Sequence, residues 1–297
     1  MRILVAGAQG QLARALHEGA PRDRSQRVVT LGRPAFDLLN PAAFAPTVRD
    51  LAPDLIVNAA AYTAVDNAER DPATAYAVNR DGAGALAAIA AKHDCPIIHL
   101  STDYVFDGTK DGRYREDDAT GPTGVYGRSK LEGEMAVAEA NGRHIVLRTA
   151  WVYAAYGSNF VGTMLRLAKE RPQLRVVADQ RGNPTYAPHL AEAIFAIAAR
   201  LASGSAPAWG IYHAAGSGDT NWHEFATAIV EAAGVLGIAP VPVVPITTAE
   251  FPTAARRPAN SCLDCSKLQR TFGVRLPHWR EGLEACIAQL AGPAKSR

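Results

Sequence analysis

The chain opens with a short apolar segment that runs directly into a glycine-rich turn and a helix-like pattern. Residues 2–6 form the apolar segment, Gly7-Ala-Gln-Gly10-Gln-Leu-Ala13 the turn, and residues 12–18 the helical pattern. The first glycine permits a tight turn, and the second lets the backbone approach a pyrophosphate at the helix N-terminus. The alternative is an ordinary strand–helix turn. Because a strand precedes the turn and a helix follows it, the sequence favours dinucleotide binding.

The following segments alternate between strand-like apolar runs and helical patterns. Further strands are predicted over residues 27–31, 54–58, 96–100 and 144–148, and a long alanine-rich helix over 72–92. This alternation predicts an α/β fold with a doubly wound, Rossmann-like parallel sheet. Beyond Trp151 the pattern is less regular, with helices predicted over 159–170, 188–201 and 222–233, a strand over 174–177, and a further strand of the main sheet over 211–215.

The change in regularity predicts two lobes. We expect a dinucleotide-binding domain over residues 1–152, to which later segments return over about 185–216. A smaller, less regular C-terminal substrate-binding lobe is expected over 153–184 and 217–297. A chain of 297 residues is long enough to bury one large core or two coupled cores.

Charge and composition exclude several classes of protein. A formal net charge of +2 is too small to argue for nucleic acid binding. No apolar run approaches the length of a membrane span, and the first apolar segment is too short for a signal peptide, so a cytoplasmic location is expected. Cys262-Leu-Asp-Cys265 lacks the second pair of a zinc site, and the histidines show no metal-ligand spacing, so no metal site is predicted.

The second predicted strand bears on the choice of cofactor. A carboxylate near its end would accept a hydrogen bond from the ribose 2′-hydroxyl of NAD, but this strand ends in Leu31-Gly32-Arg33. An arginine suits a 2′-phosphate, so NADPH is favoured, with NADH left as a second donor. Arg33 could equally be a solvated turn residue. Asp37 fits either an adenine contact or the cap of a nearby helix.

Tyr126 and Lys130 are four residues apart, so on a helix they share one face. A phenol with a pKa near ~10 is a poor proton donor or acceptor at neutral pH. A neighbouring ammonium favours the phenolate and lowers that pKa, which makes the tyrosine usable as an acid or base. In isolation, the pair is better explained as a solvated helix surface. Thr102 follows the fourth strand, so all three side chains are expected at the carboxyl edge of one sheet.

This constellation resembles the dTDP-4-dehydrorhamnose reductase family, within the extended short-chain dehydrogenase/reductase superfamily. The matching segments span nearly the whole chain in the family's order. They are Gly7–Ala13, Val57–Asp66, Ser101–Gly108, Tyr126–Lys130, Arg148–Tyr153, Asp179–Thr185 and Arg257–Asp264.

The resemblance implies reduction of the 4-keto group of dTDP-4-dehydro-L-rhamnose to dTDP-L-rhamnose, with hydride from NAD(P)H. It implies that Tyr126 is the general acid, that Lys130 lowers its pKa and holds the nicotinamide ribose, and that Thr102 binds the keto oxygen. The implied cofactor contacts are Gly7, Gly10, Gln11, Leu12, Arg33, Asp37, Leu38, Ala60, Ala61, Tyr62, Tyr126 and Lys130. The implied substrate contacts are Thr63, Thr102, Asp103, Tyr126, Trp151, Asn159 and Arg257. Trp151 is equally explained as a core residue.

One position separates this chain from close relatives. Sugar-nucleotide dehydratases of the superfamily carry Thr-Asp-Glu after the fourth strand, whereas here Tyr104 follows Thr102-Asp103. The missing acid favours reduction over elimination of water.

Some members of the family dimerise through magnesium held by glutamates, one of them on the first helix. The first helix here has alanine and arginine where the carboxylate is required. This argues against magnesium and leaves a homodimer open. Two other functions stay as alternatives: a non-catalytic NADP-binding regulatory subunit, and a reductase of another nucleotide-linked keto sugar.

Overall fold

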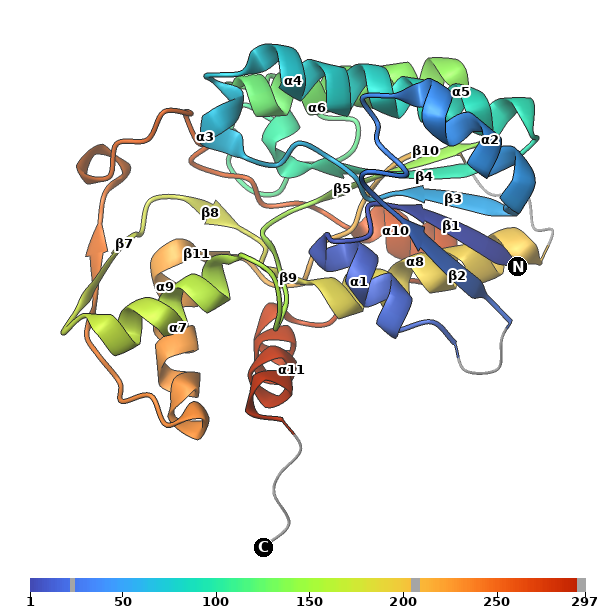
Figure 1. Cartoon of the computed structure of the whole chain (residues 1–297). Helices are drawn as coiled ribbons and strands as arrows, with labels where there is room; N and C mark the ends of the chain where they lie inside the picture. The colour runs from blue at the N-terminus through green and yellow to red at the C-terminus, as the bar shows by residue number, and fades with distance from the viewer. Residues whose placement is uncertain (22–24, 204–208, 293–297) are drawn as a thin grey trace, which may run out of the picture.

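A six-stranded parallel sheet forms the centre of the larger lobe (Figure 1). The computed structural model describes residues 1–21, 25–203 and 209–292. The strand order is β10-β5-β4-β3-β1-β2. The strands are β1 (Arg2–Ala6), β2 (Arg27–Leu31), β3 (Leu55–Asn58), β4 (Ile97–Thr102), β5 (His144–Thr149) and β10 (Gly210–His213). The order reverses between β1 and β3, and ligands of open α/β sheets bind at the carboxyl ends of strands at such a switch point.

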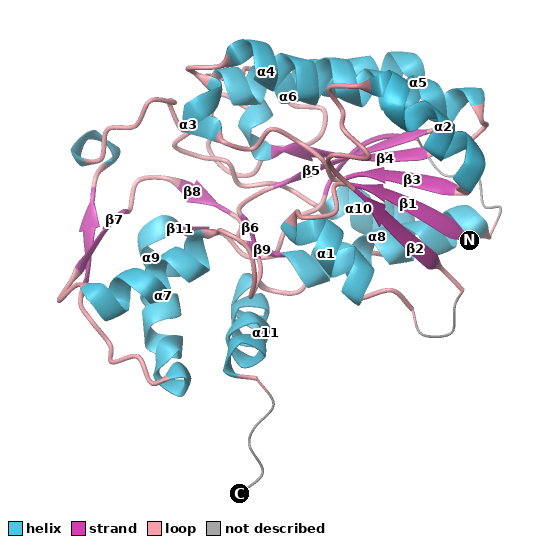
Figure 2. Ribbon diagram, viewed as in Figure 1, coloured by secondary structure: helices cyan, strands magenta, loops and turns pink. Residues whose placement is uncertain are grey.

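Helices cover both faces of this sheet, which is why β1 is apolar at each position after Arg2 (Figure 2). Successive side chains of a strand point to opposite faces. Ile3 and Val5 pack into the core beneath α1 (Gln11–Glu18) and α8 (Ala187–Ala202). Leu4 and Ala6 pack into the opposite core, to which the helices α2 (Pro41–Leu51), α5 (Ala83–Lys92) and α6 (Val125–Ala140) contribute. The predicted Rossmann-like fold is confirmed.

The predicted helix over 72–92 is divided by a π-helical turn. It consists of α4 (Pro72–Tyr76), the turn η1 (Ala77–Gly82) and α5. Within the turn, the side chain of Asn79 accepts from the backbone nitrogen of Tyr62 at 2.8 Å and donates to the carbonyl oxygen of Tyr62 at 3.1 Å. The Asn79 amide also donates to Ser129 Oγ at 3.0 Å. π-Helical turns are frequent at functional sites. Here the turn fixes the segment that follows β3 against α6.

The smaller lobe is built around the aromatic core of Tyr153, Phe225 and Trp279. Its helices are α7 (Phe160–Glu170), α9 (Trp222–Ala232) and α11 (Trp279–Ala291). Its strands form three short pairs: β7 (Leu174–Val177) with β12 (Val243–Ile246), β6 (Val152–Tyr153) with β9 (Thr185–Tyr186), and β8 (Arg181–Gly182) with β11 (Thr220–Asn221).

Several of the described elements were not predicted, among them α2, β12, α10 (Ser266–Phe272) and α11. Prolines lie inside two of them, Pro46 in α2 and Pro245 in β12, and proline interrupts the usual signals of helix and strand.

The division into two lobes at the predicted boundaries stays a prediction. Residues 22–24, 204–208 and 293–297 of its ranges lie outside the described part of the chain. Helix α10, which falls in the range predicted for the smaller lobe, contributes Leu268 and Phe272 to the core beneath the main sheet. None of the helices within the described ranges has both the length and the apolar character required to cross a bilayer.

Candidate active site

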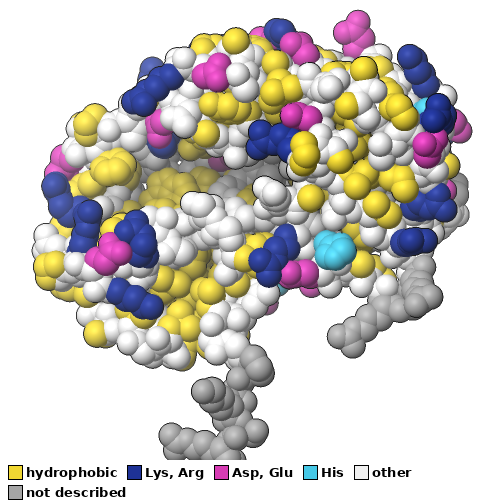
Figure 3. All heavy atoms as spheres, in the orientation of Figure 1, with side chains coloured by type: hydrophobic (Ala, Val, Ile, Leu, Met, Phe, Trp, Pro, Cys, Tyr) yellow, Lys and Arg dark blue, Asp and Glu magenta, His cyan; other side chains and the backbone are white. Residues whose placement is uncertain are grey.

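A cavity of about 770 Å³ lies at the carboxyl ends of β1, β3 and β4. Figure 3 shows the molecular surface hollowed between the two lobes, with hydrophobic side chains inside the hollow. The cavity lining includes each of the predicted cofactor contacts: Gly7, Gly10, Gln11, Leu12, Arg33, Asp37, Leu38, Ala60, Ala61, Tyr62, Tyr126 and Lys130. Of the predicted substrate contacts, it includes Thr63, Thr102, Asp103, Tyr126 and Trp151.

The glycine turn brings the backbone of two strand ends together. Gly7 has a φ of +110°, and an added Cβ would lie 3.1 Å from the backbone nitrogen of Ala60 after β3. Gly10 is the N-cap residue of α1 and provides no side-chain cap. Backbone N–H groups at the start of α1 therefore border the cavity, in the arrangement that binds a pyrophosphate in dinucleotide-binding folds. These residues fit a nicotinamide dinucleotide.

Arg33 and Asp37 follow β2 on the same wall of the cavity. The Asp37 carboxylate accepts from the backbone nitrogen of Leu39 at 3.1 Å, and the N-cap of α2 is Asn40. Asp37 therefore stabilises a local turn and does not cap α2. Arg33 is exposed and lines the cavity next to Gly32.

Tyr126 lies in the first turn of α6, and its helix packs closely against the loop after β4. An added Cβ at Gly127 would lie 2.2 Å from the carbonyl oxygen of Tyr104, so only glycine permits this approach. The ring of Tyr104 meets the ring of Tyr126 edge-on, with centroids 5.9 Å apart. The phenol of Tyr126 is thereby held beside Thr102.

Burial raises the pKa of Tyr126 to about 12, and the Thr102 hydroxyl opposes this rise. Thr102 accepts from the backbone nitrogen of Tyr104 at 3.2 Å and donates to Asp103 at 3.0 Å. Burial also raises the pKa of Asp103 to about 6. The site thus combines a phenol that stays protonated at neutral pH with a hydroxyl beside it.

Lys130 is placed differently from the expectation that it acts directly on the phenol. Its Nζ donates to the carbonyl oxygen of Leu100 at 2.5 Å and lies 3.3 Å from Nε2 of His99. Burial lowers the pKa of Lys130 to about 8, although the Glu134 carboxylate raises it. Within the described part of the chain no hydrogen bond joins Lys130 to Tyr126. In this structure the group that lowers the Tyr126 pKa is Thr102.

Trp151 forms part of the wall between the lobes. Its backbone has a φ of +48°, which is uncommon for a bulky residue and concentrates at functional sites. Its indole stacks on that of Trp222, with centroids 3.5 Å apart and planes within 5°. Trp222 was not predicted as a site residue, because only the tertiary fold brings α9 to this position. Both tryptophans belong to the aromatic packing, and Trp151 also faces the cavity.

Two predicted substrate contacts lie outside the cavity lining. Asn159 is the N-cap of α7, and its amide donates to Gln11 Oε1 at 3.0 Å and to the Ala154 carbonyl at 2.8 Å. The Arg257 guanidinium pairs with Asp66 at 2.7 Å. Asn159 thus supports the cavity residue Gln11, whereas Arg257 joins the loop after β12 to the helix after Thr63.

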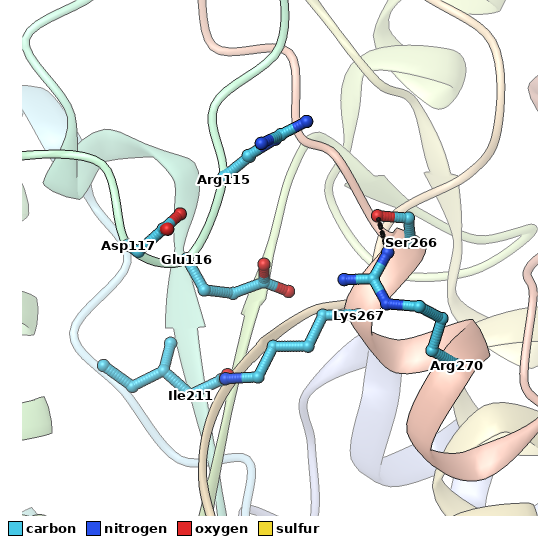
Figure 4. A pocket seen from close by; sticks show the side chains of 7 residues that line it. All are labelled: Arg115, Glu116, Asp117, Ile211, Ser266, Lys267 and Arg270. Carbon is cyan, nitrogen blue, oxygen red and sulfur yellow. Dashed lines mark hydrogen bonds between the residues drawn. The ribbon is translucent and has the colours of Figure 1, made fainter.

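A second cavity, of about 440 Å³, lies between the loop after Tyr114 and α10 (Figure 4). Two of its three cations are engaged by hydrogen bonds, since Lys267 donates to the Ile211 carbonyl at 2.8 Å and Arg270 to Ser266 at 2.9 Å. It contains none of the predicted site residues. We therefore place the candidate site in the larger cavity.

Over residues 1–21, 25–203 and 209–292, no group of three or more histidine, cysteine, aspartate or glutamate side chains is arranged to hold a metal ion. On the first helix, Arg14 pairs with Glu18 at 2.6 Å.

Comparison with known proteins gives one consistent result. Residues 1–291 match the family model described as RmlD substrate binding domain. A dTDP-4-dehydrorhamnose reductase of Sinorhizobium fredii (strain NBRC 101917 / NGR234) is 54% identical over 288 residues, which cover 97% of each chain. A protein of the same name from Burkholderia thailandensis is 48% identical, covering 98% of this chain and 99% of that protein.

Solved structures agree with the sequence comparisons. The crystal structure of a dTDP-4-dehydrorhamnose reductase from Clostridium acetobutylicum is similar with a TM-score of 0.90 and 36% identity, covering 98% of this chain and 99% of that one. The structure of the Bacillus anthracis protein of this name in complex with NADP has a TM-score of 0.87 and 35% identity, covering 96% and 98%.

Proposed function

The chain belongs to the dTDP-4-dehydrorhamnose reductase family, and from this premise we propose that it reduces the 4-keto group of dTDP-4-dehydro-L-rhamnose to give dTDP-L-rhamnose. The observation that carries the proposal is that one cavity is lined by the glycine turn and by Thr102, Tyr126 and Lys130. A dinucleotide and a sugar carbonyl can both be bound there, on one side of the sheet switch point.

The cofactor is proposed to be NADPH, which supplies the hydride when bound. Backbone N–H groups at the start of α1 would hold its pyrophosphate, and Arg33 would bind its 2′-phosphate. NADH lacks the phosphate that Arg33 would meet, so we propose that it is the weaker donor. Magnesium is not proposed, because the first helix presents Arg14 paired with Glu18 rather than a free carboxylate.

Tyr126 is proposed as the general acid. Reduction turns the keto oxygen into an oxyanion, which needs a proton, and an alkoxide is far more basic than a phenolate. A pKa raised to about 12 keeps Tyr126 in the protonated form that can give this proton at neutral pH. The Thr102 hydroxyl is next to it and would hydrogen-bond the same oxygen. Lys130 would hold the ribose hydroxyls of the cofactor.

The residues at the end of β4 and directly after it favour reduction over dehydration. Tyr104 occupies the position where dehydratases of the superfamily carry a glutamate, and its half-buried ring meets the ring of Tyr126 edge-on. Those dehydratases use the glutamate together with the aspartate to eliminate water, and with Tyr104 at this position Asp103 has no second carboxylate beside it. Thr63 and Trp151, on the same cavity, are proposed substrate contacts, together with Asp103 and, from outside the lining, Asn159 and Arg257.

The test measures NADPH oxidation as a decrease in NADPH absorbance, with and without dTDP-4-dehydro-L-rhamnose. We expect turnover that depends on the sugar and a product that co-elutes with dTDP-L-rhamnose. A panel of other nucleotide-linked keto sugars tests the alternative substrate, which would be favoured if one of them gave a higher kcat/KM. Tight NADPH binding without turnover on any of them would instead favour the regulatory subunit.

A further inference from the structure

A line of buried polar groups leads from the cofactor wall to Lys130 beneath the carboxyl edge of the sheet. It consists of the Ala60 backbone nitrogen, Asn58 at the end of β3, His99 in β4 and the Lys130 amine from α6. The three side chains are buried. Asn58 and His99 are register partners in adjacent parallel strands, which brings their side chains together. The functional roles considered above leave Asn58 and His99 unused.

The hydrogen bonds in this line have defined directions. The Ala60 N–H donates to Asn58 Oδ1 at 3.3 Å, which leaves the amide nitrogen of Asn58 3.1 Å from Nδ1 of His99. An amide nitrogen is only a donor, so Nδ1 must accept, and the single proton of a neutral imidazole is then on Nε2. Nε2 lies 3.3 Å from Nζ of Lys130.

This arrangement fits an uncharged Lys130. An Nε2–H group needs an acceptor, and an ammonium has none, whereas a neutral amine offers its lone pair. The amine still has hydrogens to donate to the Leu100 carbonyl at 2.5 Å. The line of hydrogen bonds from Ala60 to Lys130 is therefore complete when Lys130 is an amine.

Protonation of Lys130 reverses the donor and acceptor roles along this line of hydrogen bonds. An ammonium must donate to Nε2, so the ring proton moves to Nδ1, and Nδ1–H then needs the amide oxygen of Asn58. The amide turns over to present that oxygen, and the Ala60 N–H loses its acceptor. Ala60 lines the cofactor cavity, so an oxygen of a bound ligand can accept from this N–H instead.

We propose that Asn58 and His99 are positioning residues that couple the charge of Lys130 to occupancy of the cofactor wall at Ala60. In the free protein the line favours the amine, and a ligand that accepts from Ala60 favours the ammonium. The inference rests on the proposed function only in assigning Lys130 to the cofactor. It deepens that assignment by stating when the lysine becomes charged.

The charged groups around this line are compatible with both states. On α6, Tyr126 lies one turn before Lys130 and Glu134 one turn after it. Glu134 is engaged by Arg148 of β5 at 2.7 Å and by Ser101 of β4. Asp103 follows β4. Burial lowers the pKa of Lys130 to about 8, and burial and the Lys130 charge both lower the pKa of His99, so amine and ammonium are both accessible while the imidazole stays neutral.

The tautomer of His99 reports directly whether Lys130 is an amine or an ammonium. In protein carrying ¹⁵N-labelled histidine, two-bond ¹H–¹⁵N correlation spectra distinguish a proton on Nε2 from one on Nδ1. Spectra are recorded well above and well below the Lys130 pKa of about 8, with and without NADP⁺. We expect the Nε2–H tautomer in the free protein at high pH, and a shift to Nδ1–H at low pH or on addition of NADP⁺.

His213 provides an internal control, since it is also buried in the sheet and its ring nitrogens have no hydrogen-bond partner within the described residues. Burial lowers its pKa to about 3, so its signals should not change. Two variants isolate the coupling. Lys130→Met removes the titrating group beside Nε2, so the His99 tautomer should no longer change with pH, and Asn58→Asp, which offers only acceptors, should hold His99 as Nδ1–H.

An unchanged His99 tautomer across pH and NADP⁺ would overturn the proposal, and so would a pH-dependent shift that persists in Lys130→Met. If Asn58→Asp fails to fold, the wild-type and Lys130→Met spectra decide alone. The readout requires no turnover. A normal tautomer shift in a protein that reduces no keto sugar would therefore contradict the proposed function and support the coupling.

Discussion

The guanidinium of Arg257 lies 2.7 Å from the carboxylate of Asp66, and this ion pair connects the loop after β12 to α3 (Val65–Ala68). Asp66 also accepts from the backbone nitrogen of Ala255 at 3.0 Å. The hydrogen bond from Arg257 lowers the pKa of Asp66. Because α3 directly follows the cavity residues Thr63 and Ala64, this pair holds a segment of the smaller lobe against the rim of the site.

The ion pair separates two roles for Arg257. If Arg257 only holds the rim, Arg257→Met and Asp66→Asn should have equal effects, since a partly exposed pair contributes about 0.2–1 kcal/mol. If Arg257 also contacts the substrate, the Arg257→Met variant additionally loses a charged hydrogen bond to the substrate, which contributes about 1.5–3 kcal/mol. We expect the second outcome, with KM for the dTDP sugar raised at least about tenfold in Arg257→Met and less in Asp66→Asn. Equal KM values in steady-state kinetics would remove Arg257 from the substrate contacts.

Replacing Tyr126 by phenylalanine removes the proton donor and keeps the ring against Tyr104. Loss of a general acid lowers the rate by about 10²–10⁴-fold, so kcat should fall at least a hundredfold. Affinity for NADPH, measured by fluorescence titration, should change little. Thr102→Val is the matched variant for the neighbouring hydroxyl. Unchanged kcat in Tyr126→Phe would assign the proton donor to another group.

Arg33→Ala tests the preference for NADPH. The guanidinium is proposed to bind the 2′-phosphate, and a charged hydrogen bond contributes about 1.5–3 kcal/mol, or roughly tenfold to a hundredfold in affinity. We expect the Kd for NADPH to rise by that factor and the Kd for NADH to stay nearly constant. Titration of both cofactors against wild type and variant gives the result directly. Equal losses for both would show that Arg33 acts on a part that they share.

Asp103 should make stability depend on pH. Burial raises its pKa in the folded protein to about 6, above the ordinary value of 3.8. The folded state therefore binds the proton more tightly than the unfolded state, and this stabilisation is complete below the unfolded pKa and is lost as the pH rises through about 6. Asp103→Asn, which cannot ionise, should raise the free energy of unfolding above that pH.

One pKa unit corresponds to about 1.4 kcal/mol, so the rise from 3.8 to about 6 gives a gain on the order of 3 kcal/mol. Urea denaturation at pH values on both sides of the two pKa values measures it. The difference between variant and wild type should shrink as the pH falls towards the unfolded pKa. A variant that is less stable than wild type at high pH would mean that the ionised Asp103 has a stabilising partner.

Local patterns predicted the elements that carry the cofactor wall. β1 is apolar at each position from Ile3 to Ala6 because both faces are covered, and the glycine turn follows it immediately in sequence. Tyr126 and Lys130 share a helix turn, so their spacing alone indicates proximity. Each of these patterns spans only a few consecutive residues, so it can be read from the sequence without knowledge of the tertiary fold.

Partners that depend on register could not be found this way. His99 and Asn58 are 41 residues apart and meet only because β3 and β4 pair as Asn58↔His99. The stack of Trp151 on Trp222 requires α9 to pack against the segment after β5. The direction of the Lys130 side chain, towards Leu100 rather than the phenol, is likewise decided by packing between α6 and β4.

The glycine in the Tyr126-Gly127 pair offers the sharpest test of how α6 is positioned. A Cβ at residue 127 would lie 2.2 Å from the Tyr104 carbonyl, which belongs to backbone and cannot move aside easily. Gly127→Ala should therefore push the helix away from the β4 loop, at a cost of about 1–3 kcal/mol in unfolding free energy, as for other overpacked sites. Because the same shift moves Tyr126 relative to Thr102, kcat should fall by roughly a hundredfold. Gly142→Ala is the matched control, since a Cβ there meets no atom within 4 Å. A Gly127→Ala protein with wild-type stability and kcat would show that the spacing between α6 and the Tyr104 backbone does not position the proton donor.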